Sequence, residues 1–102
     1  MALAQQQLST SVDTVYTSTG SSVVTGLYLV NTSSSAVAVN IYFVPDSQSA
    51  SLSTVVYYNR TIDSHDTLVL LSERVLLSSG DRIQASCSAD LSVTASLVYT
   101  LL

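Results

Sequence analysis

The sequence contains no lysine and no tryptophan, and its only positive side chains are Arg60, Arg74 and Arg82. Seven acidic residues bring the formal net charge to −4, and charged residues make up only 10% of the chain. Nucleic-acid binding depends on clustered Lys and Arg that neutralise phosphates, and anionic membranes attract polybasic segments. Three scattered arginines supply neither, so we expect no nucleic-acid partner and no membrane partner.

Long hydrophobic runs are also missing, although the mean hydropathy is high at +0.43. A membrane-spanning helix needs about 20 consecutive apolar residues, and Ser and Thr interrupt every run before that length. The opening MALAQQQLST lacks the basic and apolar segments of a secretory signal, and a single cysteine cannot form an internal disulfide. We therefore expect a protein that is made in a cytoplasm and that hides part of its surface in an assembly.

Groups that carry catalytic or metal chemistry are scarce, with one histidine, His65, and one cysteine, Cys87. His65 lies in an Asp-Ser-His-Asp turn, and a Ser-His-Asp site stays formally open only because serine is abundant. Cys87 alternates with Ile83 and Ala85, which predicts a buried position. The aspartates lack the spacing of a calcium loop, so they are better explained as turn residues. We predict no enzyme, no catalytic residue, no metal and no cofactor.

What the sequence does contain is short alternating strands bounded by Ser, Gly, Asp and Asn, without helical periodicity. We predict an all-β fold, a single antiparallel β-sandwich or jelly roll of about seven to eight short strands. Residues 1–9 are expected to form an amino-terminal arm, and residues 10–102 one domain of ordinary size. The predicted strands are residues 13–17, 22–31, 36–44, 53–60, 67–71, 82–88 and 91–101.

Residues 23–44, VVTGLYLVNTSSSAVAVNIYFV, are predicted to form a β-hairpin whose first strand is apolar on both faces. Strict alternation places Leu27 on one face and Val24, Tyr28 and Val30 on the other. One face builds the core, and the second needs a cover. Since large exposed apolar patches usually mark contacts, we expect Tyr28 and Val30 to contact a neighbouring subunit.

The same two-faced pattern recurs at Tyr57, Tyr58 and Val98. Tyrosine combines a large apolar ring with a hydroxyl group that can stay in water, which suits an interface. We add these three residues to the predicted interface, together with Leu3 and Leu8 of the expected arm. The alternative is that loops and the arm of the same chain cover these faces.

Three stretches share features with a known family: the opening YTSTGSSVVTGLYLVNTSSSAVAVNIYFVP, the central VVYYNRTIDSHDTLVL and the late RVLLSSGDRIQASCSADLSVTASLVYTL. In the late stretch, Gly80 supplies a permissive backbone and Asp81 a side-chain acceptor just before a strand. With these stretches, residues 16–99 resemble small Ser/Thr-rich β-sandwich virion proteins of tailed bacteriophages, of the capsid cement or decoration type.

The resemblance implies a virion structural protein, made in the cytoplasm of a host bacterium. The role that it favours is a cement protein on the capsid surface, which binds the major capsid protein as a homo-oligomer, with a trimer favoured. A neck, tail or fibre component is the alternative within the same class. A receptor- or carbohydrate-binding module that presents the loops 46–52 and 63–66 is the alternative from another class.

Overall fold

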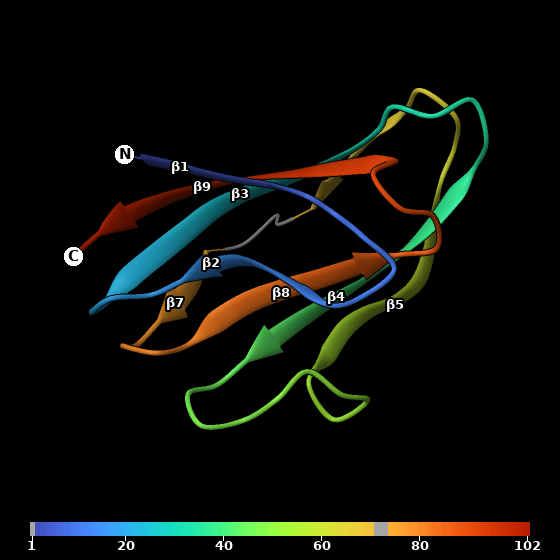
Figure 1. Cartoon of the computed structure of the whole chain (residues 1–102). Helices are drawn as coiled ribbons and strands as arrows, with labels where there is room; N and C mark the ends of the chain where they lie inside the picture. The colour runs from blue at the N-terminus through green and yellow to red at the C-terminus, as the bar shows by residue number, and fades with distance from the viewer. Residues whose placement is uncertain (1, 71–73) are drawn as a thin grey trace.

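The computed structural model describes residues 2–70 and 74–102, and these ranges contain β-strands and no helix (Figure 1). The all-β prediction is therefore confirmed for the described part of the chain. The strands are β1 (Ala2–Gln7), β2 (Asp13–Thr17), β3 (Ser22–Asn31), β4 (Val37–Val44), β5 (Val55–Ile62), β6 (Thr67–Leu70), β7 (Val75–Leu77), β8 (Arg82–Cys87) and β9 (Val93–Leu101).

The strands form two antiparallel sheets, which lie one above the other in Figure 1. The first sheet has the order β1-β9-β3-β6, and β7 also pairs with β3. Because β6 pairs with residues 27–30 of β3 and β7 with residues 22–24, the two short strands occupy the same edge of this sheet. The second sheet has the order β2-β8-β4-β5.

The hydrophobic core lies between the two sheets and takes side chains from both. Alternating residues of each central strand point into it, as expected for sheets with one buried face. Full burial of each large aliphatic side chain contributes about 1.5–3 kcal/mol. Leu27, Leu29 and Leu97 of the first sheet and Val39, Ile41 and Ile83 of the second are among its fully buried members.

The predicted hairpin over residues 23–44 is wrong, because β3 and β4 belong to different sheets. The chain crosses between the sheets just after Asn31, which is fully buried. Its Nδ2 donates to the carbonyl oxygens of Ser35 at 2.8 Å, Ile62 at 3.0 Å and Asp63 at 3.2 Å. Asn31 thus provides the hydrogen bonds that two connections would otherwise lack where the strand ladders end.

A β-bulge changes which residues of β3 share a face. The register with β9 shifts between Val24 and Gly26, and one extra residue reverses the faces to which later side chains point. Val24 therefore points into the core with Leu27, and neither is more than 1% exposed, whereas Tyr28 points outward. The prediction that Val24 and Tyr28 share a face is wrong for this reason.

Strand β1 occupies part of the segment expected to be an arm. It pairs antiparallel with β9, from Ala2 opposite Tyr99 to Gln7 opposite Thr94. The next residue, Leu8, is 0% exposed in the core cluster, so its assignment to an interface is wrong. The strand was missed because alanine and glutamine give little β signal.

The other predicted strands agree with the structure to within two residues at each end. Residue 71, the last of the predicted strand 67–71, lies outside the described residues. Strand β7 was not predicted, because three residues are too short to show alternation.

The connection between β4 and β5, residues 45–54, folds over the outer face of the second sheet. Tyr42 and Val44 of β4 lie outside the core cluster, yet they are only 9% and 1% exposed. The guanidinium group of Arg82, on the adjacent strand β8, donates to the carbonyl oxygen of Gln48 in this connection. The outer face of the second sheet is therefore partly covered by the chain itself.

Candidate interaction surfaces

The outer face of the first sheet exposes apolar side chains from all five of its strands. Leu76 of β7 is 72% exposed, Leu3 of β1 67%, Val69 of β6 64% and Tyr28 of β3 39%, and Val98 of β9 is half-buried. The register places Leu3 opposite Val98 and Tyr28 opposite Val69. These five residues define what we call the first-sheet face.

Gly26 shapes the middle of this face. A Cβ atom at Gly26 would lie 3.3 Å from Cε2 and 3.4 Å from the hydroxyl oxygen of Tyr28. The ring of Tyr28 therefore lies against the backbone of Gly26, opposite Val98 in the register. The absence of a side chain lets the ring lie along the sheet, which extends the apolar surface between β3 and β9.

The five strands of the first sheet contain no charged residue. The polar side chains that accompany the first-sheet face come from Gln, Ser and Thr, and Gln5 Nε2 donates to Ser96 Oγ at 3.0 Å. By contrast, the strands of the second sheet carry Asp13, Arg60 and Arg82. The interior of protein interfaces is depleted in charge in the same way.

A second exposed apolar surface lies on β5, at the edge of the second sheet. Val56 is 46% and Tyr58 65% exposed, and these two residues define the β5 edge. Tyr57 between them points inward and packs against the core cluster. An edge strand also has backbone groups that another chain can pair with, so this surface offers both apolar side chains and a strand edge.

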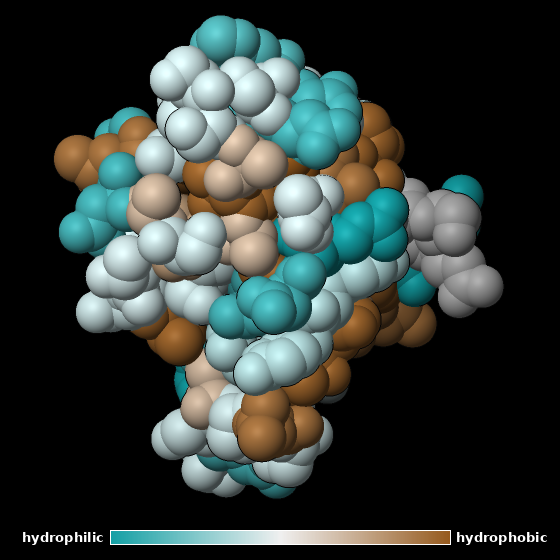
Figure 2. All heavy atoms as spheres, turned by 90° about the vertical axis from the view of Figure 1, so that its right-hand side faces the viewer, coloured by the Kyte–Doolittle hydropathy of each residue, from teal (hydrophilic) through white to brown (hydrophobic). Residues whose placement is uncertain are grey.

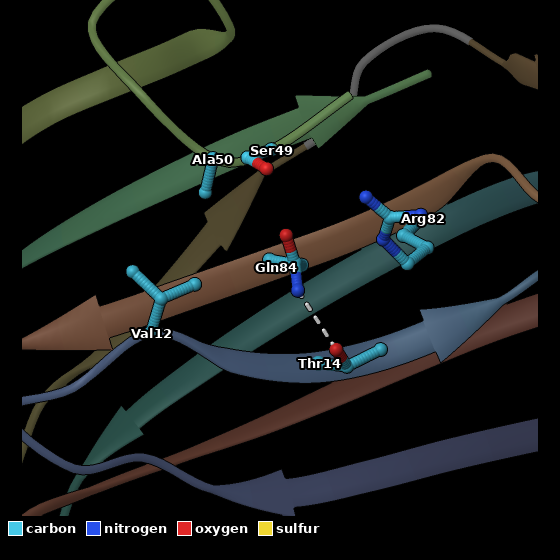
Figure 3. Close-up of a pocket in the computed structure, with 6 residues that line it drawn as sticks. All are labelled: Val12, Thr14, Ser49, Ala50, Arg82 and Gln84. Carbon is cyan, nitrogen blue, oxygen red and sulfur yellow. Dashed lines mark hydrogen bonds between the residues drawn. The ribbon is translucent and has the colours of Figure 1, made fainter. Parts of the chain in front are cut away.

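A shallow hollow of about 410 Å³ lies on the outer face of the second sheet, beside the 45–54 connection (Figure 3). Gln84 Nε2 donates to Thr14 Oγ1 at 2.8 Å across its floor, and Arg82 donates to the carbonyl oxygens of Gly80 and Gln48. These groups therefore already bond within the chain. The lining residues are Val12, Thr14, Ser49, Ala50, Arg82 and Gln84.

The predicted turn and core positions of the two potentially reactive residues are confirmed. His65 adopts a left-handed φ of 57° in a turn closed by the hydrogen bond from Asp66 N to Asp63 O at 3.1 Å. Ser64 Oγ, 3.3 Å from His65 Nδ1, donates to the carbonyl oxygen of Ser33 at 2.9 Å. Cys87 is buried, and this burial raises the pKa of its thiol. Neither residue is placed as an activated nucleophile.

The described residues include no group of three or more His, Cys, Asp or Glu side chains that could hold a metal ion. Within the same ranges, no helix has the length and apolar character needed to cross a membrane. Figure 2 views the molecule from the right-hand side of Figure 1, where hydrophilic and neutral residues predominate and smaller hydrophobic patches reach the surface between them.

The structure brings together four of the predicted interface residues and separates the rest. Leu3, Tyr28, Val30 and Val98 lie on the outer side of the first sheet. Tyr58 is exposed on the other sheet, whereas Tyr57 and Leu8 contribute to the core. Sequence reasoning missed Val69 and Leu76, although the alternation of Val69 with Leu68 and Leu70 was a usable signal. The comparisons found no matching family model, curated protein or solved structure.

Proposed function

We propose that the protein is a structural subunit of a tailed-bacteriophage virion, a capsid cement protein that binds the assembled shell on its surface. The observation that carries the proposal is the presence of two separate exposed apolar surfaces, the first-sheet face and the β5 edge, on opposite sheets. A subunit with two such surfaces can contact a sister subunit with one and a major capsid protein with the other. The sequence resemblance supports the choice of a virion.

The strand order supports the further proposal that the fold is a jelly roll. If β6 and β7 count as one interrupted strand, there are eight strands in the orders β1-β9-β3-β6/β7 and β2-β8-β4-β5, and the chain changes sheet after every strand except β4, which pairs with β5. Jelly rolls are common among viral capsid proteins and lectins. The fold alone therefore suits both a capsid role and a carbohydrate-binding role. The choice between them depends on the exposed surfaces and not on the fold.

The proposed mechanism is thermodynamic linkage. A protein that binds the assembled shell and not its separated subunits stabilises the shell by RT ln(1 + [L]/Kd), which is about 2.7 kcal/mol per site at a hundredfold excess over Kd. No chemical step is needed. Apolar contact surfaces are sufficient, and they also explain the low content of charged residues.

The experiment that tests the proposal is co-sedimentation of the purified protein with phage capsids that lack it, followed by imaging of the decorated particles. We expect saturable binding on the head and a higher temperature of capsid disruption. A Tyr58→Arg variant should bind at least about tenfold more weakly, since a charge would be desolvated in the contact. The matched control is Leu91→Arg, because Leu91 is similarly exposed at 61% and lies outside both surfaces.

If imaging places the protein at the neck, tail or fibre, the cement role is wrong and one of the other virion roles replaces it. Binding to a glycan array without binding to capsids would overturn the virion proposal and favour the carbohydrate-binding module.

A further inference from the structure

We infer that the first-sheet face binds the same face of a second copy of this chain about a two-fold axis. The inference deepens the proposed function, on which it rests for its biological meaning, by naming the occupant of one of the two surfaces. It commits to a pair, in place of the trimer that the sequence resemblance favours. Such a pair would expose one β5 edge on each outer side and could therefore bridge two capsid subunits.

The polar groups of the first sheet's outer side are self-complementary. A two-fold axis places each patch against its own copy, so the patch must be able to bind itself. Gln5, Thr94, Ser96 and Thr67 each carry groups that donate and accept hydrogen bonds, as does the hydroxyl group of Tyr28. A lysine or aspartate near the axis would instead meet a like charge.

The distribution of charge favours this face over other contacts between copies. The formal net charge is −4, and no charged residue lies in the first-sheet strands. Two copies that approach through their remaining surfaces bring like net charges together, which is unfavourable. Contact through the first sheets keeps the charged residues of the second-sheet strands, Asp13, Arg60 and Arg82, on the outside.

The size of the face approaches the requirement of a stable dimer. Four strand positions spaced about 4.8 Å apart give a width of about 19 Å, and the ten residues of β3 give a length of about 33 Å. The projected area is then at most roughly 600 Å² before the relief of the side chains is added, because β1, β6 and β7 are shorter than β3. An ordinary specific interface buries about 800 Å² of accessible surface per partner.

Exposed apolar side chains supply the favourable contribution to the free energy of dimerisation. Leu3, Val69 and Leu76 are each more than 60% exposed, whereas the outer face of the second sheet has the 45–54 connection across it. Sheet faces pack about 10 Å apart with interdigitating side chains. A second first-sheet face would therefore remove these three side chains from water on both copies.

The experiment is sedimentation velocity and light scattering of the full chain in the absence of capsids, over about 1 to 300 µM, because dimerisation depends on concentration. We expect a monomer–dimer equilibrium for the wild type. Val69→Glu and Leu76→Glu should each weaken it at least about tenfold, because each copy would bury an unpaired carboxylate in the contact. Both side chains are exposed in the monomer, so far-UV circular dichroism and Tm at low concentration should stay unchanged.

The matched control is Tyr58→Glu, which adds the same charge at a similarly exposed position on the other sheet. It should leave the dimer intact. A monomeric or trimeric wild type, or a dimer that survives both glutamates on the first-sheet face, would overturn the inference. Because capsids are absent from this experiment, its failure is distinguishable from failure of the capsid-binding proposal, which Tyr58→Arg tests.

Discussion

Single residues fix the chain where it passes between the sheets, and Asn31 is the clearest example. Its Nδ2 reaches three carbonyl oxygens, and its Oδ1 accepts from Ser33 N at 3.0 Å and Ser33 Oγ at 2.7 Å. We expect Asn31→Leu to lower the free energy of unfolding by about 3 kcal/mol, because buried backbone groups lose their partners. Urea denaturation measures this loss.

The control for Asn31 is Ser35→Ala, since Ser35 contributes its carbonyl oxygen and not its side chain to this network. Ser35 is exposed, so we expect a change within about 0.5 kcal/mol. A loss below about 1 kcal/mol in Asn31→Leu would contradict the assigned role.

Asp81 is a second residue with a local structural role. Its carboxylate accepts hydrogen bonds from Ser78 N and Asp46 N, each at 2.9 Å, and these bonds hold the pKa of Asp81 below its ordinary value. A lowered folded-state pKa contributes stability above the unfolded pKa of about 3.9, and this contribution disappears as pH falls through the folded value.

We expect Asp81→Asn to have a modestly lower Tm than the wild type at neutral pH, because the charged acceptor is lost. The difference should shrink as the pH falls below about 4. Thermal melts of both proteins across this range measure it. A difference that stays constant with pH would mean that the ionised carboxylate contributes nothing.

At the scale of single elements, substitutions in β1 test whether this segment is a strand of the sheet or a free arm. In β1 the side chain of Ala4 packs against the core, and that of Gln5 is exposed. We expect Ala4→Asp to lower the free energy of unfolding by about 2–4 kcal/mol, since an unpaired carboxylate would face the core. Gln5→Asp introduces the same residue on the other face and should change it by less than about 1 kcal/mol. Chemical denaturation at low protein concentration measures both, and equal losses would contradict the strand assignment.

Alternation in the sequence was enough to predict β2, β3 and most other strands, because each has one side in the core. It could not predict which strands pair, since the Ser-rich connection after Asn31 suits a hairpin and a crossing equally well. The Val24–Gly26 bulge also reverses the faces within β3, and its one local signal, an isolated glycine inside a strand, does not fix the register. The candidate surface was predicted in part: alternation indicated outward positions for Tyr28, Val30 and Val98, whereas Leu3 was expected in an arm and the inward position of Leu8 depends on the tertiary fold.

The whole molecule separates its charge from its larger apolar surface. The described strands of the first sheet have no charged residue, whereas the strands of the second sheet carry Asp13, Arg60 and Arg82. If copies associate through the first sheet, added salt removes no attraction and screens the remaining repulsion. We expect the dimer Kd to stay constant or fall slightly between about 50 and 500 mM NaCl. Sedimentation equilibrium measures this dependence, and a dimer that salt dissociates would point to ion pairs instead.

The pairing of β1 with β9 has a consequence for folding kinetics. Ala2 lies opposite Tyr99. Strand β1 can therefore pair only after β9, which is far from it in the sequence, has been synthesised. Proteins dominated by such distant pairings fold slowly, in milliseconds to seconds. During synthesis the uncharged strands of the first sheet stay incomplete until β9 has emerged, and this interval is when the chain is most exposed to aggregation.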